Sequence, residues 1–514
     1  MTKADIGAIT LGPRIPPRAG ALVALGLAVA ATALPVLLHL TATAAGVAMC
    51  FVLGILVAIF ATAVVPVVLI FCYMFQNLFV ALISPQIADL DQFNSIRAYN
   101  FVLTVATWAV IAGSYWMARR EFDARVRTLM TATTLVLIVV GLYFALGLTI
   151  NASSAMIYLR NIAAPLLLFQ ILLLVAQQHR LAVTAPLVLA ATAALLFGYL
   201  ELFAQDQLYR LINADVYINW QLKRQIDAGG ELFRDYMDAL VVDFLNTPWF
   251  ADLELRFYRL VGPNFHPISY AYMLAIFSVL LAAMGRWWFA LLAFPLLLGV
   301  GSKGALVFVL LVGGALVLVR HGRGFAPVWR FSGVLAAYVA TAIWMGIDAG
   351  DYHVIGFIGG LRGFLNNPLG HGIGSGGNLS LAMTTTEWIR SQNLGSTDIA
   401  MESAVGVLLY QMGVFGLVLC GVIGWIAIKL WRRYLDTRER VFAVAALGLL
   451  TITVNGIFQE EALFSPLALG LLLAFCGLLL GRAYRGGGAP PSVTRGTKAD
   501  REQILRDSIK LDQE

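Results

Sequence analysis

Charged residues are scarce in this sequence. Only 12% of the 514 residues are Asp, Glu, Lys or Arg, whereas soluble domains carry about 25%. Hydrophobic residues make up 60% of the chain, and its mean hydropathy is +0.81. A soluble protein of this composition would leave much apolar surface in water, and a disordered chain would be far more polar. The composition therefore predicts an all-α, polytopic integral membrane protein.

Cysteine is also rare, which excludes a disulfide scaffold. The four cysteines lie inside apolar runs and lack the spacing of metal ligands, so we expect them to act as small buried hydrophobes. The net charge of +6 would suggest nucleic acid as a partner in a soluble chain. In a membrane protein the positions of the charges matter more than their total, and we expect no nucleic-acid partner.

Long apolar runs dominate the chain instead. A spanning helix needs about 20 mostly apolar residues, because the hydrocarbon core of a bilayer is about 30 Å thick. We count about fourteen such segments, at residues 20–39, 43–61, 64–84, 98–118, 128–149, 157–176, 181–202, 266–284, 287–301, 304–320, 331–347, 402–428, 441–458 and 463–481.

The distribution of charge predicts the orientation of these segments. With a cytoplasmic N-terminus and fourteen spans, the inner side holds 24 of the 35 basic residues, and the outer side, including the outer ends of the spans, holds 19 of the 29 acidic residues. This asymmetry follows the positive-inside rule, so we expect both termini in the cytoplasm. The N-terminal segment is polar and no small-residue cleavage site follows the first apolar run, so we expect no cleavable signal peptide.

Residues 1–481 thus form one predicted transmembrane domain, and residues 482–514 a flexible cytoplasmic tail. Two outer segments, 203–265 and 348–401, are much longer than the other connections, and long connections are often functional. In the first, apolar residues recur at helical spacing on both sides of Gly229-Gly230. We therefore expect two amphipathic helices there, covering a cavity or lying on the outer leaflet.

Several basic residues lie at the outer ends of spans, where a charge is costly unless it has a partner or a ligand. They are Arg160, Arg256, Arg259, Lys303 and Arg362. On a helix, Arg256 and Arg259 would share a face, and two guanidinium groups suit a diphosphate. The alternative is that they pair with nearby carboxylates or with lipid headgroups.

Polar residues accompany these cations. Asn264 and His266 follow the Gly262-Pro263 break at the mouth of the next span. Lys303 opens a later span, where the helix N-terminus favours anions, although snorkelling to the interface explains a lysine there equally well.

Glycine is dense in "IGGLRGFLNNPLGHGIGSGGN" at 358–378, which contains Arg362, Asn366 and His371. Such a loop can bring backbone N–H groups to a ligand, while His371 alone is also typical of an exposed loop. Glu402, at the outer end of the twelfth segment, suits either a general base or a carboxylate that stabilises a helix N-terminus.

The order of these motifs on one face resembles the O-antigen ligase and polysaccharide polymerase superfamily. The resemblance covers about residues 255–425 and rests on "RLVGPNFHP", "GSKGALVFVL", "NNPLGHGIGSGGN" and "YQMGVFGLVL". The earlier "YLRN", with Arg160, is similar to exopolysaccharide polymerases of that group.

The resemblance implies a GT-C-like fold with two periplasmic helical loops in the bacterial inner membrane. It implies a glycosyltransferase without metal or other cofactor that transfers glycan from undecaprenyl diphosphate to an acceptor hydroxyl on the periplasmic face. Arg256, Arg259 and Arg362 would hold the diphosphate with the assistance of Lys303. Many members carry a His-Asn pair where this chain has Glu402-Ser403, so Glu402 and His371 both stay candidates for the catalytic base.

The segment "YLRN" and the long first outer loop favour a polymerase, while a ligase that transfers glycan to lipid A core is the alternative. A polymerase of this kind is expected to work beside a flippase and a co-polymerase. A lipid-linked oligosaccharide flippase or other transporter is a third reading. Transporters place ionisable residues near the middle of the membrane, whereas the predicted spans here hold almost none.

Overall fold

The structure is a computed structural model, and the part of the chain that it describes is nearly all helical. The described residues are 17–227, 240–243, 256–320, 324–380, 390–391, 394–397 and 399–485. The first half contains α1 (Pro17–His39), α2 (Thr43–Phe60), α3 (Val65–Ile83), α4 (Leu90–Arg97), α5 (Tyr99–Met117), α6 (Ala124–Leu148), α7 (Ala152–Gln178), α8 (Thr184–Ile212), α9 (Ala214–Asp227), β1 (Val241–Asp243) and β2 (Arg256–Tyr258). The second half contains α12 (Pro267–Ala283), α13 (Trp288–Val300), α14 (Lys303–Arg320), α15 (Ala326–Ala349), α16 (Tyr352–Asn366), α18 (Ala404–Met412), α19 (Val414–Thr437), α20 (Arg440–Asn455), α21 (Glu460–Phe464), the π-helical turn η5 (Pro466–Gly470) and α22 (Leu471–Tyr484).

Ten helical segments in the described part of the chain are long and apolar enough to cross a membrane, and four shorter apolar helices accompany them. All fourteen segments predicted from the sequence fall on helices. The protein is therefore a multi-pass membrane protein by length and composition, while the count of fourteen spans stays a prediction.

The twelfth predicted segment, 402–428, is not one helix. It divides into α18 and α19 at Gly413, whose φ is 57°. A Cβ atom there would come within 2.0 Å of the Pro368 carbonyl oxygen, so only glycine fits. Hydropathy continues across this break, which is why the sequence predicted a single span.

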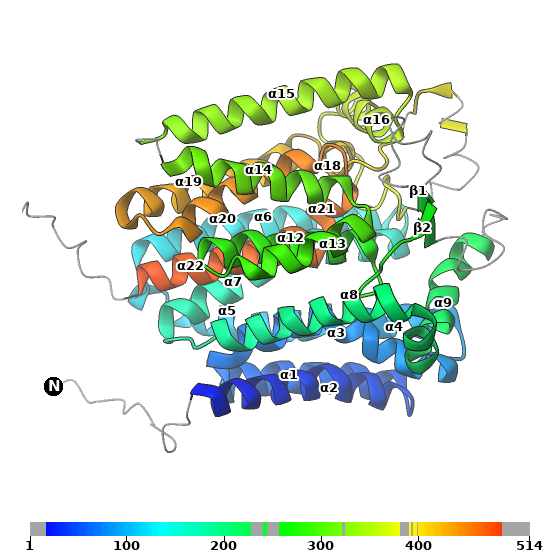
Figure 1. Cartoon of the computed structure of the whole chain (residues 1–514), viewed down its shortest axis with the longest axis vertical. Coiled ribbons are helices and arrows are strands. Elements are labelled where there is room, and N and C mark those ends of the chain that lie inside the picture. Colours follow the sequence, from blue (N-terminus) through cyan, green and yellow to red (C-terminus); the bar gives the residue numbers. More distant parts are fainter. Residues whose placement is uncertain are drawn as a thin grey trace, which may run out of the picture.

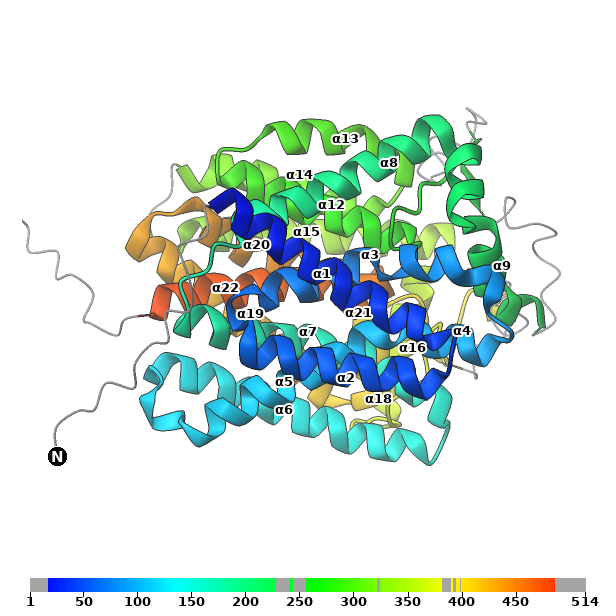
Figure 2. The same ribbon diagram turned by 90° about the horizontal axis from the view of Figure 1, so that it is seen from below.

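The helices run side by side along one direction, and α7, α12 and α22 occupy the middle (Figures 1 and 2). In α7, 89% of the most apolar stretch is buried, and α22 packs along its length. On one side lie α1, α2, α3 and α5, and on the other lie α14, α15 and α16. The burial of α7 on all sides explains why it is apolar around its whole circumference.

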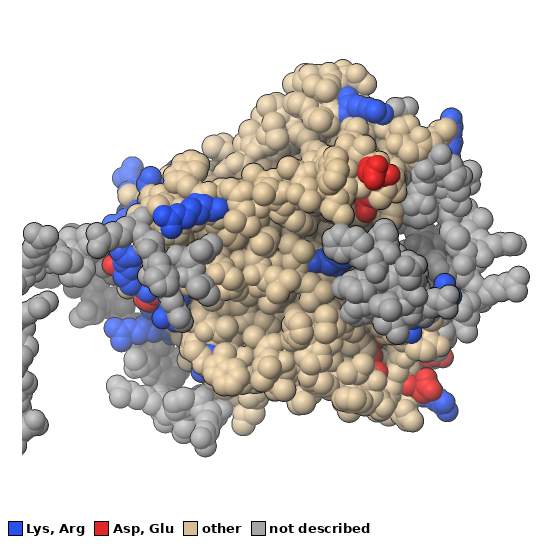
Figure 3. All heavy atoms as spheres, turned by 45° about the horizontal axis from the view of Figure 1, so that its top comes forward, with Lys and Arg blue, Asp and Glu red and all other residues tan. Residues whose placement is uncertain are grey.

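The two ends of the bundle differ in charge. Lys and Arg side chains gather at the left end in Figure 3, where α1 begins and α22 ends. We call this the basic end; Arg120, Arg180 and Arg432 lie there. The opposite end carries α4, α9, β1, β2 and the beginning of α16, and the candidate site residues belong to it (Figure 1).

The long outer segments are partly as predicted. The first contains a helix, α9, but Arg256–Tyr258 form a strand that pairs antiparallel with β1. The prediction that Arg256 and Arg259 share a helix face is therefore wrong, because residues three apart in an extended segment point to opposite sides. The predicted break at Gly229-Gly230 lies outside the described residues. So does the predicted tail from residue 486 onwards.

Candidate functional site

A buried carboxylate in α8 positions the loop that precedes α12. Glu201 is 1% exposed, and it accepts hydrogen bonds from the backbone N–H groups of Val261 at 2.7 Å and of Gly262 at 2.9 Å. The Tyr209 hydroxyl donates a further bond of 2.8 Å to the same carboxylate. With all of its partners in place, Glu201 fixes the chain immediately before Asn264 and His266.

Asn264 and His266 lie in that loop as predicted, and both are held by hydrogen bonds. The Asn264 carbonyl accepts a 2.7 Å bond from the Asn77 side chain of α3, and its own amide nitrogen donates to the His266 carbonyl at 3.2 Å. His266 caps α12: its Nδ1 accepts from the Ser269 N–H at 3.3 Å. A backbone N–H can only donate, so the neutral ring carries its proton on Nε2.

Cations surround His266. Burial, followed by the charges of Arg259 and Arg97, lowers the pKa of His266 to about 4. The imidazole is therefore neutral at physiological pH and offers Nε2–H as a hydrogen-bond donor.

Arg97, Arg160 and Arg259 form what we call the arginine cluster. Arg97 ends α4 and stacks over the Phe93 ring at 5.1 Å, and it is close enough to Arg160 of α7 for the two charges to repel. No carboxylate of the described residues forms an ion pair with either one. Like charges at the edge of an apolar bundle are costly unless an anion joins them.

Arg259 connects this cluster to the α13 terminus and to an acidic group. Its Nε donates a 2.8 Å hydrogen bond to the carbonyl of Val300, the last residue of α13. Burial lowers the pKa of Arg259, and the charge of Glu461 opposes that shift. Arg259 thus lies between the cationic and the acidic parts of the site.

The acidic part consists of Glu402, Glu460 and Glu461, which we call the carboxylate cluster. Glu402 precedes α18, has a φ of 54° and keeps 21% of its side chain exposed. Burial, followed by repulsion from Glu461, raises the pKa of Glu402 to about 8. A carboxyl group with such a pKa can gain and lose a proton near neutral pH.

Two further groups border Glu402. His353, in the first turn of α16, lies with Nδ1 at 3.9 Å from Glu402 Oε2, which is an ion-pair distance and too long for a hydrogen bond. Asn378 Oδ1 accepts a 3.1 Å bond from the Glu402 backbone N–H.

Asn378 also links Glu402 to Glu460. The Asn378 backbone N–H donates to Glu460 Oε2 at 3.0 Å, and the Tyr158 hydroxyl of α7 donates to Glu460 Oε1. Burial raises the pKa of Glu460 to about 7. The carboxylates are therefore held by partners from α7 and from the loop after α16, which are far apart in sequence.

Lys303 begins α14 beside this cluster. It is exposed, and Asp351 and His353 lie within electrostatic range of it. The next residue, Gly304, allows a close approach: a Cβ there would meet Gln459 Oε1 at 2.1 Å and the Tyr272 hydroxyl at 2.5 Å. The "SKG" segment thus places Lys303 by packing α14 tightly on α12 and on the chain after α20.

The glycine-rich loop does not present its N–H groups as predicted. Those of Gly372 and Gly377 bond the carbonyls of Gln411 and Ala400, at 2.9 and 2.7 Å. A Cβ on Gly377 would meet the Tyr158 hydroxyl at 2.0 Å. These two glycines therefore serve close packing of the loop against neighbouring segments.

Four predicted residues lie on α16, on β2 and in the glycine-rich loop. His371 stacks on the Tyr410 ring at 4.3 Å and contacts the Tyr410 carbonyl through Nδ1 at 3.0 Å. Arg362 and Asn366 are exposed on α16, whose buried glycines Gly356, Gly360 and Gly363 face α18. Arg256 is exposed on β2. No interaction found among the described residues joins Arg362 to Arg259, so the expected meeting of these two guanidinium groups at a diphosphate stays a prediction.

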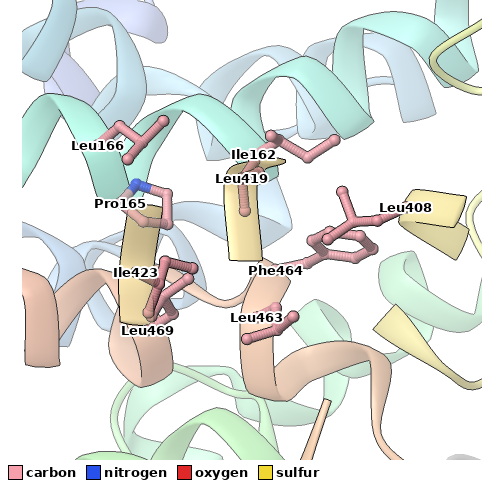
Figure 4. Close-up of a pocket in the computed structure, with 9 residues that line it drawn as sticks. All are labelled: Ile162, Pro165, Leu166, Leu408, Leu419, Ile423, Leu463, Phe464 and Leu469. Atoms are coloured by element: carbon pink, nitrogen blue, oxygen red, sulfur yellow. The ribbon is translucent and has the colours of Figure 1, made fainter. Parts of the chain in front are cut away.

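A small apolar pocket, whose volume is about 270 Å³ including its opening, adjoins Phe464 and is drawn in Figure 4. It lies between α7, α18, α19 and the α21–η5 segment. The Phe464 ring on its wall stands edge-on to Tyr158, with centroids 5.6 Å apart. Its lining consists of Ile162, Pro165, Leu166, Leu408, Leu419, Ile423, Leu463, Phe464 and Leu469.

Sequence reasoning missed Arg97, His353, Asn378, Glu460 and Glu461. Asn378 is the last residue of the glycine-rich motif, and Glu460-Glu461 is a charged pair between two apolar runs, so both carried a signal. In the described part of the chain, no group of three or more His, Cys, Asp or Glu side chains is arranged to hold a metal ion. No known family model matches the chain, and no curated protein matches it in sequence.

Proposed function

We propose that this protein is a glycosyltransferase of bacterial surface polysaccharide synthesis that uses an undecaprenyl-diphosphate-linked glycan as donor. One observation carries the proposal: three arginines, two of which have no carboxylate partner among the described residues, are linked through Arg259 and Glu461 to Glu402, whose pKa is near 8. The arginine cluster suits binding of a diphosphate, and the carboxyl group suits transfer of a proton from a hydroxyl.

The arginine cluster supports binding of the diphosphate. Guanidinium groups form forked, charge-assisted bonds to phosphate oxygens, and the neutral His266 adds an Nε2–H donor. Cations fixed in place stabilise the negative charge that develops on a departing diphosphate. Arg97 takes the place that the sequence had given to Arg362.

Glu402 is the base that the geometry favours over His371. In the proposed step, an acceptor hydroxyl oxygen forms a bond to the anomeric carbon, the bond from that carbon to the diphosphate breaks, and the hydroxyl proton passes to the Glu402 carboxylate. The diphosphate leaves with the electron pair, held by the arginine cluster. His371, stacked and bonded on Tyr410, serves packing in this scheme.

The position of the proposed site at one end of the helical bundle suits a donor that is anchored in the membrane. The site belongs to one end of a bundle of apolar helices, so a polyprenyl chain attached to the diphosphate would extend beside them.

The proposed acceptor is a second carrier-linked glycan, which makes the protein a polymerase; transfer to lipid A core would make it a ligase. A deletion strain separates these two. Single repeat units remain on the glycan when polymerisation is lost, whereas full-length chains remain on the carrier when ligation is lost.

The donor site is tested by single substitutions in proteoliposomes that contain carrier-linked glycan. We expect Arg160→Ala and Arg259→Ala to lower turnover by about 100-fold or more, the usual effect of removing one donor to a developing anion. Arg210→Ala, an exposed arginine of α8 at the same end, is the matched control and should keep turnover near that of the wild type. Arg362→Ala should resemble the control, although the sequence alone predicts a large loss.

Equal turnover in all four variants would remove the site assignment. Movement of carrier-linked glycan across the bilayer without any lengthening would instead identify a flippase.

A further inference from the structure

A groove at the basic end, opposite the end of the bundle that carries the proposed site, is not used by the proposed glycan transfer. It lies between the end of α7, the beginning of α8, and the ends of α12 and α22, and its volume is about 850 Å³ including its open side. The groove arises because α22 packs along α7, whereas α8 packs on α3 and α13 and leaves a gap towards the membrane.

The walls of this groove are apolar and its rim is basic. Leu187 and Val188 of α8 face Phe277 of α12 and Leu478 of α22 across it. Arg482, Arg485 and His179 lie at its basic-end rim. A ligand that fills it therefore needs an apolar chain and an anionic head.

The rim carries an excess of positive charge. Arg482 forms an ion pair with Glu439, whereas no carboxylate of the described residues pairs with Arg485. Arg485 donates through Nη1 to the His179 carbonyl, which fixes the guanidinium group at the rim. A guanidinium group has five N–H donors, so the others remain for a ligand.

Two further arginines lie near the rim, but each of them is paired with a carboxylate. Arg125 and Arg433 both stack on Tyr484, each 5.3 Å from the ring centroid. They lie next to Asp123 at 3.9 Å and Asp436 at 3.6 Å. With these two arginines matched by carboxylates, Arg485 supplies the unbalanced charge.

We propose that this groove binds an anionic phospholipid of the leaflet at the basic end, with an acyl chain between α8 and α22 and the phosphate on Arg485. Basic pockets between membrane helices are suited to anionic headgroups, and the apolar walls exclude a soluble phosphate. The lipid fills the gap that α8 leaves and so connects α8, which carries Glu201, to the central helices. This proposal does not depend on the proposed glycosyltransferase activity.

The test measures lipid retention by the purified full-length protein with native mass spectrometry and by titration with vesicles of phosphatidylglycerol or phosphatidylcholine. We expect tighter retention of phosphatidylglycerol, and Arg485→Gln should weaken it about tenfold, as expected for loss of a charge-assisted bond. Val188→Trp, which fills the groove while leaving the rim unchanged, should weaken it as well.

Two matched controls keep the test specific. Arg120→Gln removes the same charge from an exposed position at the same end, and Leu189→Trp adds the same ring to a residue of α8 that is 50% exposed. Both should retain phosphatidylglycerol like the wild type. Equal retention of the two lipids, or equal losses in Arg485→Gln and Arg120→Gln, would overturn the proposal.

Discussion

Glu402 combines backbone strain with an unusual side-chain environment. Its φ of 54° is rare for a residue other than glycine, and such strain is found most often at functional positions. Its carboxyl group lies near Glu461 and is partly exposed, so a substrate hydroxyl can reach it. The strained backbone and the neighbouring carboxylate both destabilise the fold at Glu402, which is consistent with a catalytic group rather than a simple helix cap.

Substitution of Glu402 by Gln should separate stability from activity. The folded-state pKa, about 8, is above the ordinary carboxyl value, so ionisation of Glu402 destabilises the fold increasingly as pH rises towards 8. Glu402→Gln should therefore raise Tm relative to the wild type at pH 8 and change it little below pH 4.5, while turnover is lost. Thermal unfolding across this pH range, with Asp206→Asn as an exposed control, measures the effect; a Tm difference independent of pH would contradict the assignment.

Only part of the site could be predicted from single residues. The sequence predicted six residues of the candidate site, because a polar group at the end of an apolar run is costly unless it has a partner or a ligand. They are Arg160, Arg259, Asn264, His266, Lys303 and Glu402. Arg97 was missed because it lies in an ordinary polar connection, and only the packing of α4 brings it near Arg160. Glu461 was missed although its charged pair with Glu460 interrupts two apolar runs, because only the fold brings it near Arg259 and Glu402. Arg362 is exposed on α16, whose glycines face α18, and its predicted meeting with Arg259 stays a prediction.

The contact between α16 and α18 depends on small residues. A Cβ on Gly360 would come within 2.4 Å of the Gly406 carbonyl oxygen, so the two helices touch through their backbones. Because His353 lies in the first turn of α16 and Glu402 directly precedes α18, this contact keeps the two residues near each other.

Gly360→Ala should separate these helices and lower both stability and turnover. Overpacking of a close contact costs about 1–3 kcal/mol, which predicts a lower Tm. Gly333→Ala, in α15, meets nothing within 4 Å and should leave Tm unchanged or slightly higher. Parallel thermal scans of the two variants decide the matter, and an equal Tm would show that α16 and α18 are not in close contact.

Elements were predicted where one physical signal dominates. Long apolar runs predict helices well, because a bilayer leaves backbone groups no other partner. The strand Arg256–Tyr258 and the break at Gly413 escaped prediction because each depends on a tertiary partner: β1 for the strand, and Pro368 for the glycine.

The orientation of the whole bundle follows from its charges, and cysteine labelling tests it. Arg120 lies at the basic end and Arg210 at the opposite end, which carries the candidate site, and both side chains are exposed. Each is replaced by Cys in a separate variant. In intact spheroplasts, a membrane-impermeant maleimide should label Cys at 210 and should reach Cys at 120 only after permeabilisation. The native cysteines Cys50, Cys72 and Cys476 are buried, and the partly exposed Cys420 is replaced by Ala in both variants to remove its background. Labelling of both positions from the same side would refute the predicted topology.

Binding of the free carrier tests the central claim most directly. Undecaprenyl diphosphate and the uncharged undecaprenol differ only in the group that the arginine cluster is proposed to hold. Titration of the purified protein should give a Kd for the diphosphate that is at least about tenfold lower than for the alcohol, and Arg160→Ala should remove most of this difference while Arg210→Ala preserves it. Equal affinity for the two lipids, or a difference that Arg160→Ala leaves intact, would contradict the account.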